Sequence, residues 1–252
     1  MGRMGITFTE YLDRIDEGSR VLASPDAGGT GKRVPSCPGW NTDDLLAHCC
    51  NVLLQKLPLL RARSLEPPDP QSWTRADPAS PNLPAQLGEA ASAVLAELRA
   101  IGPDVPLWSW YAPDRSSSFW ARRLAHELAI HRVDLELALD TAVGCDPALA
   151  ADGVGEVLEV FLARPGRPVT DSGGDAVVRL QGTDLPCSWS VRMTDSGALV
   201  SAELVDRADA AIAGPVSPLY LWLWGRSSPE MLETRGDITL RDRLRSLLAL
   251  AT

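Results

Sequence analysis

The sequence predicts a mainly α-helical protein of two domains, a four-helix bundle followed by a smaller α+β domain. Three observations lead to this fold class. Four long segments before about residue 163 have apolar side chains at helical spacing. The composition then changes to Pro, Gly, Ser and Asp over residues 163–176, and shorter, alternating segments follow. We therefore expect domains at residues 1–165 and 166–252.

The first domain is predicted to contain four long helices. Asn41 suits the N-cap of the second one, and Asp43 and Asp44 follow in its first turn, where the helix dipole favours acidic side chains. Six prolines between residues 65 and 84 exclude regular structure there and predict a long surface loop. The four helices are expected at residues 6–24, 41–64, 85–101 and 122–140. Helices of this length and number are typical of a bundle.

The second domain is predicted to combine a sheet with two helices. Its strand candidates alternate polar and apolar residues and are separated by Gly, Asp and Ser. Their sequences are AVVRLQG, CSWSVRM and GALVSAELVD. Helices are expected at residues 215–225 and 238–250, joined through the turn GRSSPE.

The overall composition excludes several classes of protein. A net charge of −9 argues against a nucleic-acid partner, which requires a basic surface. No segment approaches the ~18 apolar residues of a membrane span, and the first residues contain no apolar signal segment. Five cysteines without a CxxC pair make a disulfide framework improbable, so we expect a reducing cytoplasm.

The fourth predicted helix has polar residues on its apolar face. Glu127 and His131 lie one turn apart on the side that also carries Leu124, Leu128 and Leu135. His48, in the second helix, also falls on the apolar side. Two imidazoles and a carboxylate are a ligand set for catalytic zinc.

Spacing alone leaves a second interpretation open for these residues. A Glu or His on a helix face is often solvated, or is a satisfied polar group at the margin of the core. The metalloprotease motif HExxH does not apply, because there the two histidines are the pair four residues apart. Here that pair is Glu127 and His131.

Two motifs resemble a known family. VPSCPGWNTDDLLAH at residues 34–48 and FWARRLAHELAIHRVD at residues 119–134 are similar to the mycothiol-dependent maleylpyruvate isomerase family, whose members contain a DinB-like metal-binding four-helix bundle. The resemblance implies that His48, Glu127 and His131 bind a divalent metal, most simply zinc. It also implies mycothiol, a thiol of actinobacteria, as the cosubstrate. The Arg-rich composition, with 22 Arg and only two Lys, suits such a source.

The resemblance extends to the C-terminal part through LWLWGR at residues 221–226. It implies an essential arginine, which we assign to Arg226 as a ligand for a substrate carboxylate. Capping of a helix end is the alternative role for Arg226. Asp134 lies one turn beyond His131 and is a candidate for orienting the His131 ring by a hydrogen bond, without itself binding the metal. A surface ion pair with Arg122 or Arg123 is its alternative.

The predicted function is that of a metal-dependent enzyme which adds a mycothiol thiolate to a small, anionic electrophile. Cis–trans isomerisation and S-transfer are both compatible with such a site. A non-enzymatic, metal-stabilised bundle that binds a small ligand or a protein is the alternative from another class. A carrier with an apolar pocket in the C-terminal domain is a third possibility.

Overall fold

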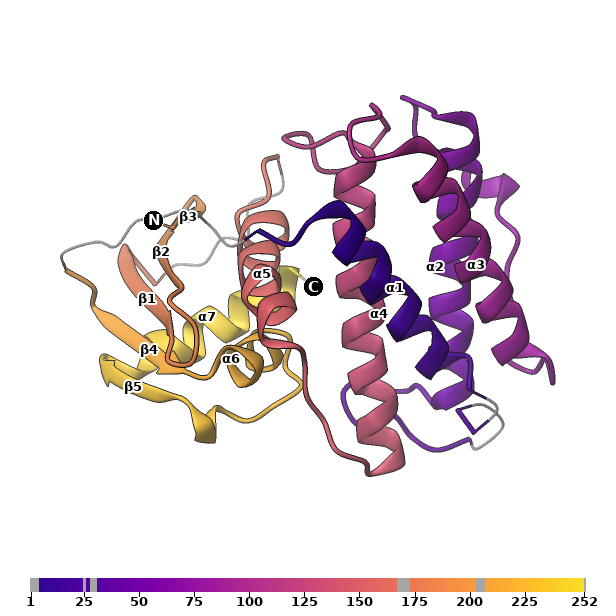
Figure 1. The fold of residues 1–252 in the computed structure, drawn as a ribbon. Helices are drawn as coiled ribbons and strands as arrows, with labels where there is room; N and C mark the ends of the chain where they lie inside the picture. Colours follow the sequence, from indigo (N-terminus) through magenta and orange to yellow (C-terminus); the bar gives the residue numbers. More distant parts are fainter. Residues whose placement is uncertain (1–4, 25, 28–30, 167–172, 203–206, 252) are drawn as a thin grey trace. The chain divides into compact units, whose positions relative to one another are not determined.

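The computed structural model describes residues 5–24, 26–27, 31–166, 173–202 and 207–251 (Figure 1). The chain divides into two compact units. We call Ile6–Val143 the bundle unit and the part from Gly144 onward the C-terminal unit. The mainly α-helical, two-part fold predicted from the sequence is confirmed.

The bundle unit is built from the four predicted helices. Helix α2 packs against α3 and α4, and α1 packs against α4 and α3 (Figure 1). The asparagine at position 41 caps α2 by accepting hydrogen bonds from the backbone of Asp43 and Asp44, at 2.8 and 3.0 Å. The helices are α1 (Phe8–Leu22), α2 (Thr42–Ala62), α3 (Leu83–Ile101) and α4 (Ser117–Leu139).

The core of the bundle unit is apolar and closely packed. Side chains such as Ile15, Leu45 and Leu53 are completely buried. Helices α1 and α4 approach closely at Gly18, where an added Cβ would lie 3.1 Å from the Cβ of Leu128. Burial of this apolar surface supplies the main driving force for assembly of the four helices.

The proline-rich segment between α2 and α3 is mostly irregular, as predicted. One short 3-10 turn, η1 (Pro70–Ser72), departs from the prediction. It forms because Asp69 accepts a hydrogen bond from the backbone of Gln71 and Pro70 fixes the first φ angle. Asn51 ties the segment to α2 by accepting a 2.7 Å hydrogen bond from the backbone of Ala76.

The C-terminal unit contains a five-stranded sheet and helices. The strands are β1 (Ala176–Gly182), β2 (Ser188–Thr194), β3 (Gly197–Ser201), β4 (Ala210–Gly214) and β5 (Glu233–Gly236), in the order β3-β2-β1-β4-β5. Strands β1 and β4 are parallel, and the other neighbours are antiparallel. The helices are α5 (Pro147–Glu156), the π-helix η2 (Val157–Leu162), α6 (Val216–Leu223), the short η3 (Pro229–Met231) and α7 (Ile238–Ala251). Both α6 and α7 contact β1 and β4.

The division of the chain differs from the boundary expected at residue 165. Helix α5 packs against α6, and η2 contacts α7 and β3, so these residues belong to the C-terminal unit. The chain passes from the bundle unit to the C-terminal unit between Val143 and Gly144. The Pro/Gly-rich stretch that suggested the boundary therefore connects elements of one unit. Its residues 167–172, like residues 203–206 of the third strand candidate, lie outside the described residues.

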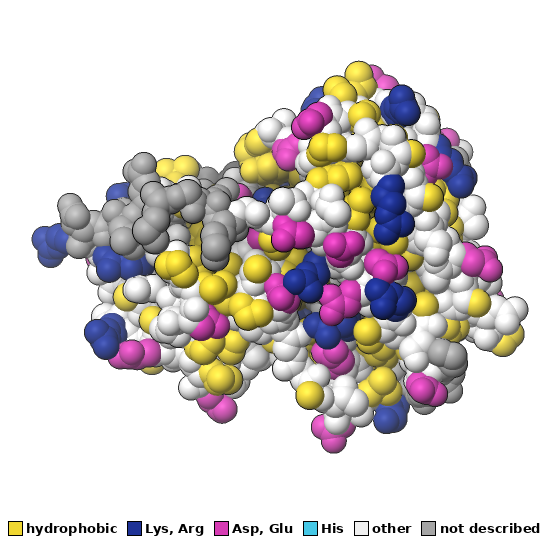
Figure 2. Space-filling view, in the orientation of Figure 1, with side chains coloured by type: hydrophobic (Ala, Val, Ile, Leu, Met, Phe, Trp, Pro, Cys, Tyr) yellow, Lys and Arg dark blue, Asp and Glu magenta, His cyan; other side chains and the backbone are white. Residues whose placement is uncertain are grey.

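The sequence also led to expectations about membrane spans, disulfides and surface charge. None of the described helices combines the length and apolarity needed to cross a membrane. All five cysteines are free thiols. Figure 2 shows acidic and basic side chains interspersed on the face drawn. The absence of a nucleic-acid partner stays a prediction.

Candidate metal centre

Helices α2 and α4 bring the three sequence-predicted ligands together. Nε2 of His48 lies 3.0 Å from Oε1 of Glu127, and Nε2 of His131 lies 3.3 Å from the same oxygen. One donor atom from each residue falls within 4.8 Å of the other two. His48 is 79 positions from Glu127 in the sequence, and His131 follows Glu127 by one turn of α4. The fold thus brings the three side chains together.

Two of the three donor-atom distances are close to those expected around a zinc ion. Tetrahedral zinc with bonds of ~2.0–2.1 Å to nitrogen and oxygen has ligand atoms roughly 3.3 Å apart. The two distances to Glu127 Oε1 are 3.0 and 3.3 Å. The side chain of His48 is 35% exposed, so one side of the donor set is open to solvent.

The second oxygen of Glu127 has a partner of its own. Nη2 of Arg123, one turn earlier on α4, donates to Oε2 of Glu127 at 2.9 Å. The Arg123 side chain is only 7% exposed, so this is a buried ion pair. Arg123 therefore fixes the carboxylate and leaves Oε1 directed at the two imidazoles.

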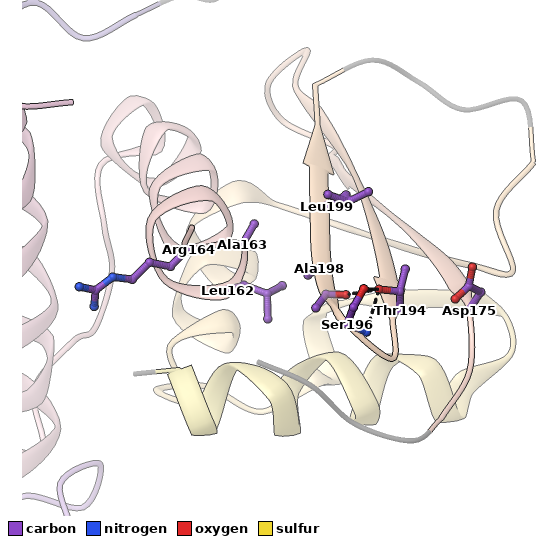
Figure 3. Close-up of a pocket in the computed structure, with 9 residues that line it drawn as sticks. Leu162, Ala163, Arg164, Asp175, Thr194, Ser196, Ala198 and Leu199 are labelled. Carbon is purple, nitrogen blue, oxygen red and sulfur yellow. Dashed lines mark hydrogen bonds between the residues drawn. The ribbon is translucent and has the colours of Figure 1, made fainter. Parts of the chain in front are cut away.

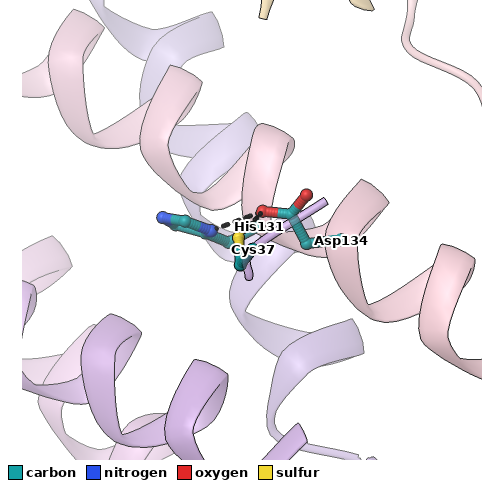
Figure 4. Close-up of side chains that lie close together, drawn as sticks. All are labelled: Cys37, His131 and Asp134. Carbon is teal, nitrogen blue, oxygen red and sulfur yellow. Dashed lines mark hydrogen bonds and ion pairs between the residues drawn. The ribbon is translucent and has the colours of Figure 1, made fainter. Parts of the chain in front are cut away.

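Asp134 holds the far side of the His131 ring. Its Oδ2 lies 2.8 Å from Nδ1 of His131. Figure 4 marks this contact with a dashed line. The thiol of Cys37 lies 3.5 Å from the same oxygen, and the hydroxyl of Ser36 donates to Oδ1. A carboxylate on Nδ1 fixes the ring and its tautomer so that Nε2 is free for a metal.

The ionisation of these groups follows from their contacts. Burial alone would raise the pKa of Glu127, but hydrogen bonds from His131 and His48 outweigh it and hold that pKa well below its usual value. Burial alone would lower the pKa of His131, but Asp134 and Glu127 outweigh it and raise that pKa to about 9. Without a metal, the protein thus holds His131 as a cation between two carboxylates.

Two groups near the centre escaped the sequence analysis. The Trp40 ring lies 4.9 Å from the His48 ring and 6.3 Å from the His131 ring, measured between centroids. Ser36 binds Asp134, as described above. Both residues belong to the VPSCPGW segment, which was quoted for its resemblance and given no chemistry. Only the folded chain shows that this loop lies against α4.

Two family models match most of the chain. A model of the mycothiol maleylpyruvate isomerase N-terminal domain matches residues 12–136, and a model of the MDMPI C-terminal domain matches residues 148–243. The chain belongs to the mycothiol-dependent maleylpyruvate isomerase family. The matched ranges of the two family models agree with the division of the chain into two units, because neither range crosses the boundary between Val143 and Gly144.

Solved structures share the fold of this family member at low sequence identity. The crystal structure of the mycothiol-dependent maleylpyruvate isomerase has a TM-score of 0.59 and 13% identity, covering 92% of this chain and 95% of that one. A mutant of that isomerase matches equally well, with a TM-score of 0.59, 12% identity and the same coverage. Identities this low show the fold alone. No curated protein matches the chain in sequence.

Arg226 lies in the C-terminal unit, at the end of α6. Its Nη1 donates a 2.7 Å hydrogen bond to the backbone carbonyl of Trp224. Its guanidinium carbon lies 6.0 Å from the centre of the Trp224 ring. A second arginine is close: burial and the charge of Arg226 together lower the pKa of Arg245. Gly225 makes room for it, because a Cβ there would lie within 2.3 Å of Nη2 of Arg245. The contact with Trp224 is of the capping kind; the substrate role stays a prediction.

Other polar or reactive candidates lie outside the donor set. His126 is buried and has its ring 6.4 Å from that of Tyr11. Burial raises the pKa of the Cys49 thiol well above its usual value, which makes the thiol unreactive. A cavity of about 380 Å³ lies within the C-terminal unit, between the end of η2 and the β2–β3 turn (Figure 3). Ser196, Ala198 and Leu199 line it, whereas the Arg164 side chain points away.

Proposed function

We propose that the protein is a zinc-dependent enzyme that uses mycothiol to attack a small electrophilic substrate. His48, Glu127 and His131 would hold the metal, and Asp134 would orient His131. The observation that supports this most directly is the convergence of two imidazole nitrogens and one carboxylate oxygen within 4.8 Å of one another. Membership of the isomerase family supports the use of a thiol.

The residues of the chain divide the work as follows. When bound, zinc would supply positive charge that favours the thiolate form of a thiol. Asp134 keeps Nε2 of His131 directed at the ligand position. Arg123 pairs with Glu127 and offsets the negative charge of that carboxylate. Trp40 lies beside the two imidazole rings.

Two reactions are consistent with such a site. A thiolate that adds to an activated cis C=C bond forms a C–S bond and leaves a single bond, about which the adduct can rotate. Loss of the thiolate then restores the double bond in the trans form. If the enolate adduct instead takes up a proton at carbon from solvent and is released as a thioether, the reaction is an S-transfer. Arg226 is proposed to bind a carboxylate of the substrate in either case.

The setting proposed for this enzyme is the reducing cytoplasm of an actinobacterium. Mycothiol must remain a free thiol to act as a nucleophile, and the five free cysteines are compatible with a reducing compartment.

The decisive experiment combines metal analysis with a reaction screen. The purified protein should contain close to one zinc per chain, and His131→Ala should lose it. Incubation with mycothiol and a panel of cis-enoic acids and simple electrophiles should give trans acids or thiol adducts. Undiminished metal in His131→Ala would remove His131 from the site. Bound metal with no product from any acceptor would favour a metal-stabilised, non-enzymatic bundle.

A further inference from the structure

Lys56 stands out among the charged residues of the bundle unit. It is one of only two lysines in the chain, and it lies on α2 eight residues after His48. Its Nζ lies 4.7 Å from the centre of the Trp120 ring on α4. Within the described part of the chain, Nζ of Lys56 has no hydrogen bond and no ion pair.

The position of Lys56 relates it to the metal centre. His48 contacts Glu127, and Lys56, later on α2, contacts Trp120, which is seven residues earlier than Glu127 on α4. Helices α2 and α4 are therefore antiparallel. Eight residues of α-helix rise ~12 Å. The backbone of Lys56 therefore lies about two turns from that of His48 on α2, and its ammonium contacts Trp120 on α4, the helix that carries the other two ligands.

The electrostatic surroundings of Lys56 favour an added anion. Burial lowers the pKa of Lys56, and the Glu127 carboxylate only partly opposes this effect. That carboxylate is already paired with Arg123. A half-buried ammonium that contacts an aromatic ring and has no ion pair or hydrogen bond within the described residues is poorly compensated, and a divalent ion at the centre would add positive charge nearby. A carboxylate would supply the missing charge and accept hydrogen bonds.

We propose that Lys56 binds the carboxylate of a ligand whose sulfur lies at the His48–Glu127–His131 centre. This inference rests on the proposed function and extends it, since it assigns an anion-binding residue within the bundle unit, separate from Arg226. The ligand class is a thiol, or the adduct of a thiol, with an acidic group several bonds from its sulfur. The Trp120 ring positions the ammonium through its cation–π contact with Nζ.

The test uses thiols that differ only at the far end. The metal-loaded full-length protein is titrated calorimetrically with 3-mercaptopropionic, 6-mercaptohexanoic and 8-mercaptooctanoic acids and with the corresponding mercapto alcohols. We expect the acid of at least one length to bind about tenfold tighter than its alcohol, the effect of one charge-assisted hydrogen bond. In Lys56→Met this preference should vanish while the affinity for the alcohols is unchanged.

Two further variants make the result specific. Lys32→Met removes the other lysine, which is exposed, and should leave the preference for acids intact. Lys56→Arg should keep most of it. An acid preference that survives Lys56→Met, or that is missing from the wild type, would show that Lys56 only packs on Trp120. Absence of metal, or of binding by any thiol, would instead refute the proposed function and this role with it.

Discussion

At the scale of single residues, the metal centre depends on two carboxylates that each have partners on both oxygens. Glu127 divides its oxygens between Arg123 and the imidazoles. Asp134 contacts His131 and Cys37 through Oδ2 and Ser36 through Oδ1. Each ligand is thus held in place before a metal arrives. This preorganisation lowers the entropy lost on metal binding.

Asp134 provides a direct test of that arrangement. Asp134→Asn keeps the shape of the side chain but loses the negative charge on Nδ1 of His131. We expect metal affinity to fall by roughly 10–100-fold, the range for lost outer partners of a zinc-bound histidine. Competition with a chromophoric chelator would measure it. Ser36→Ala, which removes only the hydroxyl on the other oxygen, is the control and should have a smaller effect. Equal affinities for wild type and Asp134→Asn would contradict the role assigned to Asp134.

The raised pKa of His131 predicts how the metal-free protein responds to pH. The folded-state pKa is about 9, against an unfolded value of 6.5. The resulting stabilisation is fully present below pH 6.5 and is lost as the pH rises through 9, by up to about 3 kcal/mol. Urea unfolding of the metal-free protein at several pH values should show this decline. The metal-loaded protein should lack it, because there the metal takes the place of the proton. A flat profile without metal would contradict the cationic state of His131.

At the scale of helices and strands, much of the fold could be predicted from periodicity and capping. The bundle helices begin and end close to the expected positions because their apolar spacing and cap residues are local signals. Strands β4 and β5 were missed: AAIAG and ETRG are short, and neither contains a run of β-branched or aromatic residues. The assignment of α5 and η2 to the first domain was wrong because helical periodicity does not show which unit a helix packs against.

The two asparagine caps of the bundle predict a contrast in stability. Asn41 accepts two backbone hydrogen bonds at the start of α2, whereas Asn82 precedes α3 without any side-chain capping bond. Asn41→Ala should therefore cost about 1 kcal/mol of unfolding free energy, and Asn82→Ala should cost much less. Denaturant unfolding of both variants would compare them directly. Similar losses would mean that helix propensity, rather than capping, decides the effect.

At the scale of the whole molecule, the site could be predicted only in part. His48, Glu127 and His131 were found because polar residues interrupt an apolar helix face. Trp40, Ser36 and Lys56 were not, since their places depend on how a loop and two helices meet in space. Arg226 was found only by resemblance, and its contact with Trp224 fits the capping alternative equally well.

Arg226 therefore needs a test that separates binding from capping. If Arg226 binds a substrate carboxylate, Arg226→Ala should reduce kcat/KM by the equivalent of about 2–4 kcal/mol while metal content and thermal stability stay unchanged. Arg226→Lys should recover little, because it lacks the planar fork. Arg241→Ala, which removes an arginine paired with Asp242, is the matched control. Unchanged kinetics with lower stability in Arg226→Ala would assign the residue to the helix end.

The contact between His48 and Glu127 also has a consequence for the kinetics of folding. The two residues are 79 positions apart, so the chain must close a long loop before both ligands are in place. We expect the complete donor set to form after the rate-limiting step. A saturating metal should then slow unfolding and leave the refolding rate almost unchanged, since it stabilises contacts that are absent from the transition state. Stopped-flow refolding and unfolding with and without zinc would show on which rate the metal acts.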